Sequence, residues 1–311
     1  MNPVTPRVLV VGTRGSALAL AQSGQVAQAL AENTGAVSDL VHIKTEGDLN
    51  PGPLASIGGT GIFVTAVRSA LLAGRVDVIV HSFKDLPTAA ATGLIIAAVP
   101  AREDPADALC ARDGLTLDGL PAGATVGTGS PRRTAQLLRR RPDLRVQPVR
   151  GNVDTRLLMV ADGRLDAVVL AASGLARLGR TAAITQILGP EVMLPAPGQG
   201  ALAVECRVAD VETAWYAAAL RELDCASTRA AVVAERTLLA TLEAGCIAPV
   251  AALASIREGT LTLQGAVLAV DGTRQIREKI SGPAGDAGEL GRELARRMLE
   301  AGAPALLGTA R

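Results

Sequence analysis

The sequence predicts an α/β protein made of two similar lobes followed by a small α+β domain. Two pairs of matching segments indicate the lobes. "AGRVDVIVHSFKDL" (73–86) and "DGRLDAVVLAASGL" (162–175) both begin with Gly-Arg-apolar-Asp and continue as an apolar run typical of a buried parallel strand. "VVGTRGSALALAQ" (10–22) and "TVGTGSPRRTAQ" (125–136) each combine a short strand, a Gly-containing loop and a helix. A repeated strand-loop-helix order of this kind is expected of two lobes with the same topology.

The third domain is predicted from a change of pattern near residue 224. A helix over 227–245, ending at a glycine, precedes three alternating runs with "EG" and "DG" turn signals, at 249–257, 260–270 and 273–281. A last helix is expected at 287–302. The Pro- and Gly-rich segment after Pro195 is expected to carry the chain back to the first lobe. The expected boundaries are 1–101 with a return segment 200–221 for domain 1, 102–199 for domain 2 and 222–311 for domain 3.

Charge and composition exclude several partners. The net charge of +1 gives no overall basic field for duplex nucleic acid, and aromatic residues, at 1%, are too few for a base-stacking surface. A local cluster remains: eight arginines lie between Arg132 and Arg156, against only Asp143 and Asp154. Because only three of the 31 basic residues are lysines, each arginine by itself is weak evidence for a binding site. The cluster needs either an anionic partner or a solvated face.

The N-terminus shows no leader pattern, and no apolar run is long enough to span a membrane, so we expect a cytoplasmic protein without membrane contact. The four cysteines are widely spaced and form no C-x-x-C pair, and the chain has only two histidines. Neither a metal site nor a disulfide framework is therefore expected. Cys110, Cys206 and Cys225 are expected to be small buried apolar residues, whereas Cys246 follows a helix in a more exposed loop.

The loop after each repeated strand is a candidate anion site. Ser16 and Ser130 each stand where a helix begins, so free backbone N–H groups and the positive end of the helix dipole lie close by. Either serine could donate its hydroxyl to an anion or simply cap its helix. Arginines in or just after both loops favour anion binding.

Eight motifs, in this order, resemble the porphobilinogen deaminase (hydroxymethylbilane synthase) family: "GTRGSALALAQ", "KTEGD", "HSFKDLPT", "REDPADAL", "GTGSPRR", "VRGNVDTRL", "LPAPGQGALAVE" and "AGCIAPVA". The resemblance spans nearly the whole chain. It implies two doubly wound lobes of the type II periplasmic-binding-protein kind with a cleft, and a small α+β C-terminal domain with a three-stranded antiparallel sheet. It also implies a cytoplasmic, monomeric transferase of tetrapyrrole (haem) biosynthesis. Such an enzyme joins four porphobilinogen molecules head to tail, releases ammonia at each step and finally hydrolyses off hydroxymethylbilane.

Porphobilinogen carries an acetate and a propionate, so arginines suit the growing chain by charge-assisted hydrogen bonds. The resemblance implies a dipyrromethane cofactor, attached by a thioether to Cys246. The cofactor-binding residues that it implies are Lys84, Asp85, Thr128, Ser130, Arg132 and Arg133. The substrate-binding residues that it implies are Arg14, Ser16, Gln22, Phe63, Arg150, Arg156, Arg177 and Gln199. Asp85 is the expected catalytic carboxylate, which stabilises the azafulvenium cation left by ammonia loss, although from the residues alone it could equally cap the turn before Pro87.

Other readings stay open at this point. A non-enzymatic two-lobed carboxylate-binding protein would need the arginines but neither Asp85 nor an exposed Cys246. A cysteine hydrolase would need a partner histidine that neither "VHIK" nor "VHSF" suggests. Thr60 stands where many relatives have lysine, and Phe63 could be a core anchor instead of a cofactor contact. Arg139, Arg140 and Arg141 match no motif and are expected at a solvated helix end.

Overall fold

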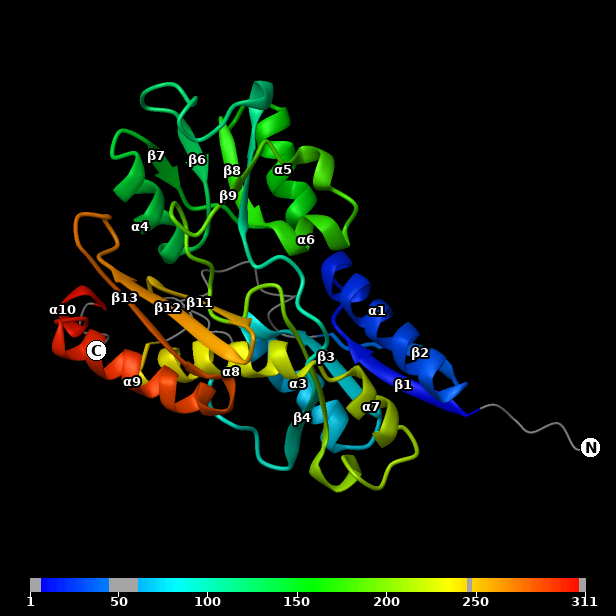
Figure 1. Cartoon of the computed structure of the whole chain (residues 1–311). Helices are drawn as coiled ribbons and strands as arrows, with labels where there is room; N and C mark the ends of the chain where they lie inside the picture. Colours follow the sequence, from blue (N-terminus) through cyan, green and yellow to red (C-terminus); the bar gives the residue numbers. More distant parts are fainter. Residues whose placement is uncertain (1–6, 45–60, 245–247, 308–311) are drawn as a thin grey trace, which may run out of the picture. The chain divides into compact units, whose positions relative to one another are not determined.

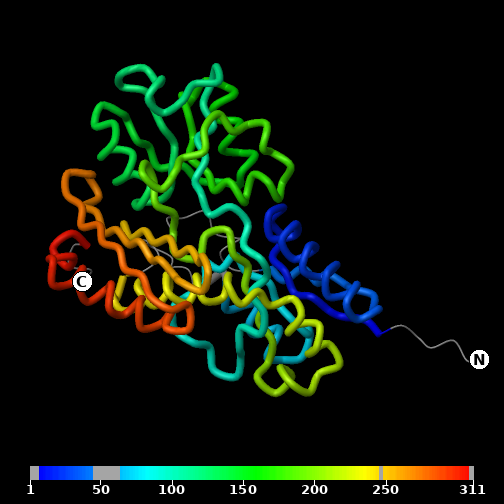
Figure 2. The backbone as a smooth tube through the Cα atoms, viewed as in Figure 1, coloured from blue at the N-terminus to red at the C-terminus, as the bar shows by residue number. Residues whose placement is uncertain are grey.

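The computed structural model describes residues 7–44, 61–244 and 248–307, with side chains omitted at 61–63 (Figure 1). The chain divides into two compact units. Unit 1 comprises Met1–Arg102 and Ala201–Arg229, and unit 2 comprises Glu103–Gly200 and Ala230–Arg311. Figure 2 shows the consequence for unit 1, in which the blue and cyan N-terminal segments are joined by a later yellow-green segment.

The sheet of unit 1 has the strand order β2-β1-β3-β10-β4. Its strands are β1 (Val8–Thr13), β2 (Val37–His42), β3 (Val78–Ser82), β4 (Leu94–Ala98) and β10 (Leu202–Arg207). β1 is parallel to β2 and β3, whereas the returning strand β10 is antiparallel to β3 and β4. Helices α1 (Ala17–Thr34) and α7 (Ala217–Leu223) pack on one aliphatic core, and α3 (Gly61–Leu72) packs on another.

The first sheet of unit 2 repeats this order with β7-β6-β8-β5-β9. Its strands are β5 (Asp107–Ala111), β6 (Thr125–Gly127), β7 (Arg145–Gln147), β8 (Ala167–Ala171) and β9 (Gln186–Leu188). β6 is parallel to β7 and β8, and β5 is antiparallel to β8 and β9. Helices α4 (Pro131–Arg140), α5 (Val153–Ala161) and α6 (Ala172–Arg177) cover the sheet. The prediction of two doubly wound lobes with one topology is confirmed.

The repeated Gly-Arg-apolar-Asp motif has a structural cause. Asp77, just before β3, accepts a hydrogen bond from Val10 N at 2.9 Å, and Asp166, just before β8, accepts one from Thr125 N at 2.7 Å. In each lobe the aspartate therefore ties the start of a central strand to its parallel neighbour. Because such a bond satisfies a backbone amide that the ladder leaves unpaired, the same residue is needed in both lobes.

The C-terminal part of unit 2 contains the predicted three-stranded antiparallel sheet, in the order β11-β12-β13. Its elements are α8 (Ala226–Thr241), β11 (Val250–Arg257), β12 (Thr260–Leu268), β13 (Gln275–Pro283), α9 (Ala287–Glu300) and α10 (Pro304–Leu307). Helix α8 ends four residues before the expected glycine, in a turn where Glu243 adopts a left-handed φ of 50°. α8 and α9 cover one face of the sheet, and the other face packs against Ala135 of α4 and Leu194.

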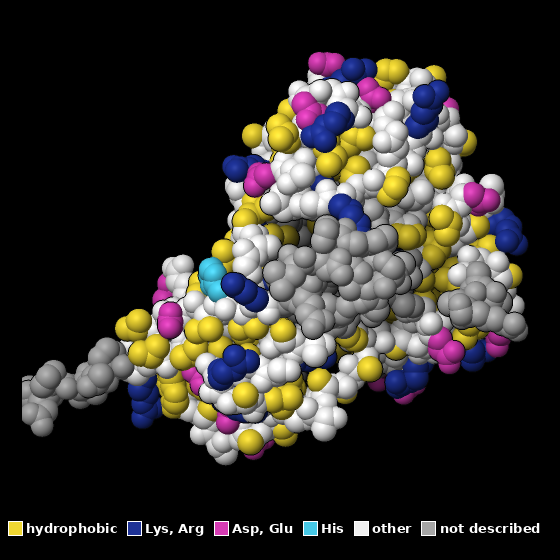
Figure 3. Space-filling view, turned by 180° about the vertical axis from the view of Figure 1, so that it is seen from behind, with side chains coloured by type: hydrophobic (Ala, Val, Ile, Leu, Met, Phe, Trp, Pro, Cys, Tyr) yellow, Lys and Arg dark blue, Asp and Glu magenta, His cyan; other side chains and the backbone are white. Residues whose placement is uncertain are grey.

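Within the described part of the chain, the surface drawn in Figure 3 shows no basic face and the helices no membrane span, in line with the near-zero net charge and the short apolar runs of the sequence. On the face drawn in Figure 3, basic and acidic side chains are interspersed, with no broad basic area among the residues that are drawn in colour. Within the described ranges no helix combines the length and the apolar character that a bilayer span requires.

Candidate functional site

The arginine cluster of unit 2 lies at one edge of its doubly wound sheet. The parallel strands β6 and β8 end at this edge, and the antiparallel strand β5 begins there, since Asp107 pairs with Ala171 at the end of β8. The loop after β6 brings Thr128 and Ser130 to the same edge, where Ser130 N donates to Thr128 Oγ1 at 3.2 Å. Ser130 occupies the N-cap position of α4, but its side chain makes no capping hydrogen bond.

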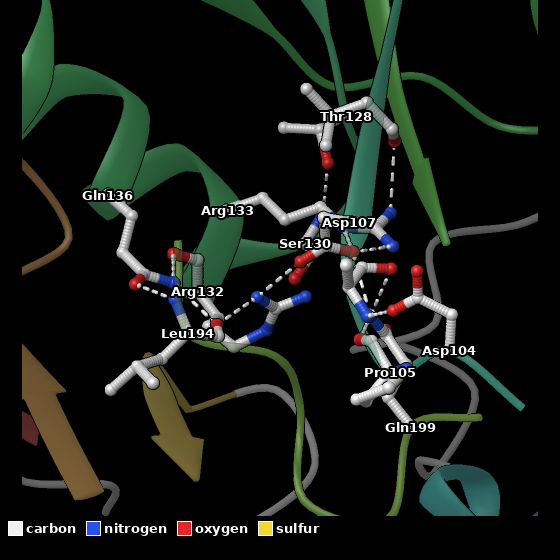
Figure 4. A network of polar contacts seen from close by, with 12 residues as sticks. Asp104, Pro105, Asp107, Thr128, Ser130, Arg132, Arg133, Gln136, Leu194 and Gln199 are labelled. Carbon is white, nitrogen blue, oxygen red and sulfur yellow. Dashed lines mark hydrogen bonds and ion pairs between the residues drawn. The ribbon is translucent and has the colours of Figure 1, made fainter. Parts of the chain in front are cut away.

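Arg132 and Arg133, in the first turn of α4, share a single carboxylate, that of Asp107. Arg132 Nη1 donates to Asp107 Oδ2 at 2.7 Å, and Arg133 donates to Oδ1 through Nη2 at 2.7 Å and Nε at 3.0 Å (Figure 4). Asp107 is 0% exposed, and the two arginines are 3% and 6% exposed. A helix N-terminus disfavours cations, so this pair of guanidinium groups depends on a nearby anion.

The charges in this network do not balance. Burial would raise the pKa of Asp107, but Arg132 and Arg133 outweigh it and hold that pKa well below its usual range, so the carboxyl is ionised. One negative charge therefore faces two positive ones. Arg156 lies in the same positive field: burial lowers its pKa, and so does repulsion from Arg133 and Arg150. Buried cations without compensation are costly unless an anionic ligand completes the site.

Several buried arginine N–H groups also favour a ligand at this site. Among the described residues, the buried Nε atoms of Arg132, Arg156 and Arg177 have no hydrogen-bond acceptor. Native proteins leave few buried donors unsatisfied, so these N–H groups are available to a ligand or to water. The excess positive charge and the free N–H groups together fit a ligand with several carboxylates.

Gln199 and Gln136 support the network with neutral groups. Gln199, 0% exposed, donates through Nε2 to Asp107 Oδ1 at 2.9 Å and to Pro105 O at 2.7 Å. Gln136 Nε2 donates to Leu194 O at 3.0 Å, and its Oε1 accepts from Leu194 N at 2.8 Å. Gln199 was expected to bind substrate, and the structure places it where it holds Asp107.

In unit 1 the corresponding edge carries the expected catalytic aspartate. β3 ends at Ser82, and the short 3-10 helix η2 (Phe83–Asp85) follows, leaving the Asp85 side chain exposed and Lys84 half-buried. β1 is the parallel neighbour of β3, so its following loop, with Arg14 and Ser16, lies at the same edge. Ser16 caps α1 by accepting a hydrogen bond from Ala19 N at 3.2 Å, which leaves its own O–H proton to donate.

Gln22 of α1 holds the end of β3 through Ser82. Its amide exchanges hydrogen bonds with the Ser82 hydroxyl, at 2.8 Å from Nε2 to Oγ and 3.0 Å from Oγ to Oε1. Gln22 is 5% exposed, so the structure shows a role in holding the strand that precedes Asp85.

A second ion-pair network, which the sequence analysis missed, joins β3 to β10 and α3. Glu205 of β10 accepts from Arg68 Nε at 2.9 Å and Arg68 Nη2 at 2.6 Å, and it lies 3.2 Å from His81 Nε2. Arg68 comes from α3 and His81 from β3, so one carboxylate ties three elements together. A buried glutamate within an apolar strand was the available sequence signal.

The remaining candidate residues differ in environment. Arg150 is exposed, and Arg177 Nη2 donates to Gly200 O at 2.8 Å. Cys246 and Thr60, and the side chain of Phe63, lie outside the described residues.

Two expectations about structural residues need correction. Cys110 and Cys206 are buried, and burial raises the pKa of each to about 11, but Cys225 is only half-buried. Cys225 directly precedes α8, and hydrogen bonds of its thiol with Ser227 and Thr228 lower its pKa. Arg141 is not simply solvated, since its guanidinium donates to the carbonyls of Leu117 and Leu120 at 2.8 and 3.0 Å.

Two doubly wound lobes, one with a buried excess of arginine charge and one with an exposed aspartate at its strand ends, define a two-lobed α/β anion-binding protein. Two family models match the chain: "Porphobilinogen deaminase, dipyromethane cofactor binding domain" over residues 9–214 and "Porphobilinogen deaminase, C-terminal domain" over 229–300. The chain belongs to the porphobilinogen deaminase family.

Relatives from the same family are similar to this chain over most of its length. The porphobilinogen deaminase of Nocardia farcinica is 54% identical over 96% of this chain and 88% of its own length. That of Thermobifida fusca is 52% identical over 96% of both chains. A solved structure of the methionine-binding protein MetQ aligns with a TM-score of 0.45 and 12% identity over 70% of this chain and 91% of that one. The family is one of transferases with a dipyrromethane cofactor, so the non-enzymatic reading is set aside.

The Glu205 network makes the free energy of unfolding depend on pH. Burial would raise the pKa of Glu205, but hydrogen bonds with His81 and Arg68 lower it from 4.5 to about 2. A depressed carboxyl pKa stabilises the fold above the unfolded-state value and loses that contribution as the pH falls through the folded-state value. We therefore expect Glu205→Gln to lower the free energy of unfolding at pH 7 by about 3 kcal/mol, with the difference shrinking from pH 4.5 towards pH 2.

Urea unfolding followed by the fluorescence of Trp215, the single tryptophan, reports on unit 1. Glu222→Gln, at an exposed position of α7, is the matched control and should leave the curve unchanged. If the difference in the free energy of unfolding between the wild type and Glu205→Gln stayed constant from pH 7 to pH 2, the stabilising role of the Glu205 ion pairs would be contradicted.

Proposed function

We propose that this chain condenses four porphobilinogen molecules head to tail, with loss of ammonia at each step, and releases hydroxymethylbilane by hydrolysis. The observation that carries the proposal is the buried excess of guanidinium charge around Asp107, because substrate and product are both polycarboxylates. Family membership supports porphobilinogen as the substrate. We further propose a cytoplasmic monomer of haem biosynthesis that needs neither nucleic acid nor a membrane.

The cofactor is proposed to be held by a set of cations and hydroxyl groups. Arg132 and Arg133 would pair with its carboxylates, Ser130 and Thr128 would add hydroxyl contacts, and Lys84 would contribute a further cation. Cys246 would provide the covalent attachment, since a thiolate is a soft nucleophile suited to a thioether. When bound, the dipyrromethane supplies the pyrrole end to which the first substrate is joined. The unsatisfied Nε of Arg132 supports this assignment.

Asp85 is proposed to act on the substrate. As the carbon–nitrogen bond of porphobilinogen breaks and ammonia leaves, positive charge develops on the methylene-pyrrole. A fixed carboxylate nearby lowers the energy of that charge and accepts a hydrogen bond from the pyrrole N–H. The exposed position of Asp85 directly after β3 supports this role, and the Gln22–Ser82 and Glu205–His81 contacts support its fixed geometry.

The carboxylates of the substrate and of the growing chain are assigned to a separate set of cations. In unit 1, Arg14 and the Ser16 hydroxyl would meet them at the strand edge that also carries Asp85. In unit 2, Arg150, Arg156 and Arg177 would do so. The unsatisfied Nε atoms of Arg156 and Arg177 support a ligand at these positions. Phe63 is proposed to pack near the ligand, while Gln22 and Gln199 would contribute indirectly through Ser82 and Asp107.

Attachment of the cofactor can be read from the mass of the protein. We expect purified wild-type protein to exceed the polypeptide mass by one dipyrromethane and Cys246→Ser to show the bare mass and no turnover, because an alkoxide is far harder to form than a thiolate. Cys225→Ser, which changes a half-buried cysteine, should keep the excess. A bare wild-type mass, or a full excess in Cys246→Ser, would refute the assignment.

The electrostatic role of Asp85 predicts a large effect from a small change. Asp85→Asn keeps the shape of the side chain but removes its charge, and we expect kcat to fall by about a hundredfold or more. Single-turnover measurements on cofactor-bearing protein would isolate the chemical step. Asp39→Asn, at an exposed position of β2, should be close to wild type. A loss below about fivefold would assign the charge stabilisation to another group.

A further inference from the structure

We propose that Asp107 is a positioning residue: its one carboxylate fixes both cofactor-binding guanidinium groups and leaves one positive charge uncompensated for an incoming carboxylate. The inference rests on the proposed role of Arg132 and Arg133. Asp107 itself belongs to none of the residue sets assigned above to cofactor, substrate or chemistry.

The hydrogen-bond pattern excludes a chemical role for Asp107. Oδ1 accepts from Arg133 Nε, Arg133 Nη2 and Gln199 Nε2, and Oδ2 accepts from Arg132 Nη1, at distances of 2.7 to 3.0 Å. The side chain is 0% exposed. A carboxylate that is surrounded by four protein donors and has no access to solvent is out of reach of a substrate proton. It can act only through the groups that it holds.

The same pattern defines the orientation of both arginines. Each guanidinium is held at two points: Arg132 Nη1 also donates to Leu194 O at 2.6 Å, and Arg133 Nη1 donates to Val169 O at 3.0 Å. The carbonyls are neutral, so they orient the planar groups without cancelling their charge. Two-point attachment prevents rotation about the guanidinium axis, which leaves the remaining N–H groups in fixed directions. The Nε of Arg132 is one such group.

The charge count explains why one acid is present and not two. With no acid, two adjacent buried cations would repel each other and the helix N-terminus behind them. With two acids, the network would be neutral and would offer little attraction to a further carboxylate. A single aspartate keeps the arginines in place while the network retains an affinity for anions. Asp107 thus occupies one carboxylate position of the cluster permanently.

A small carboxylate can test this on cofactor-free protein. Cys246→Ser, shown by mass to lack the cofactor, is the reference, and Asp107→Asn is added to it. Thermal unfolding is followed with increasing sodium acetate at constant ionic strength, balanced with chloride. Removing the Asp107 charge leaves a second guanidinium charge uncompensated, so we expect acetate to stabilise the double variant more, with half the shift reached at an acetate concentration at least about fivefold lower than in the reference.

The matched control is Asp118→Asn in the same background. Asp118 also pairs with an arginine of α4, Arg140, but its side chain is 62% exposed, so no change in acetate response is expected. An acetate response in the Asp107→Asn double variant no larger than in the reference would overturn the proposal.

The chain with Cys246 intact provides a second readout. We expect less than about a tenth of Asp107→Asn to carry the cofactor mass, because misdirected cations no longer hold it. Asp107→Glu keeps the charge but moves it by one methylene, so it should fold and carry the cofactor only partly. Should Asp107→Asn fail to fold, this variant decides: a complete cofactor load with unchanged kcat and KM would overturn the proposal, and a reduced load would support it. A wild type without the mass excess would refute the proposed function, while the acetate comparison would still report on Asp107.

Discussion

The shared carboxylate of Asp107 is the interaction on which the rest of the arginine site depends. A buried guanidinium must be paired, and two adjacent ones at a helix N-terminus are unfavourable without an anion. The doubly wound topology supplies that anion geometrically, because the antiparallel strand β5 starts at the edge where β6 and β8 end. The first residue of β5 therefore faces the first turn of α4, and the fold places an acid where the site needs one.

The network also links the second lobe to the C-terminal part of unit 2. Gln199 contacts Asp107, and the adjacent Gly198 N donates to Glu235 of α8 at 2.6 Å. The other carboxylate oxygen of Glu235 accepts from Ala254 N of β11 at 2.8 Å. A continuous polar path thus runs from the arginines to α8, the helix that precedes Cys246 in the sequence. Within unit 2, the position of that helix and the orientation of the arginines are set by connected contacts.

Much of the architecture follows from patterns that are local in sequence. The paired motifs around Asp77 and Asp166 predicted two lobes correctly, because each aspartate makes the same backbone contact in its own lobe. The three alternating runs predicted the C-terminal sheet for a similar reason, since strand periodicity and turn residues are local signals. The arginines in the first turn of α4 were also found, but their partner was not. Asp107 is the first residue of a buried apolar strand and lies 25 residues from Arg132 in the sequence, so only the tertiary fold joins them.

Other contacts could not be predicted from the sequence because they join residues that lie far apart along the chain. The contacts of Gln22 with Ser82 and of Glu205 with Arg68 span 60 and 137 residues, so no spacing rule reveals them. Cys225 was expected in a core because cysteine is commonly buried, but it directly precedes a helix and its thiol accepts a hydrogen bond from Thr228. The assignment of Cys246 remains a prediction based on the family motif, as this residue lies outside the described part of the chain.

The central claim is that uncompensated guanidinium charge at Asp107 is reserved for carboxylates of the cofactor. The most direct measurement is a crystal structure of the purified protein with the cofactor attached. The account predicts cofactor carboxylate oxygens within hydrogen-bond distance of Arg132 and Arg133, with both arginines still bound to Asp107. Cofactor carboxylates held by other cations, with Arg132 and Arg133 contacting only protein groups, would contradict it.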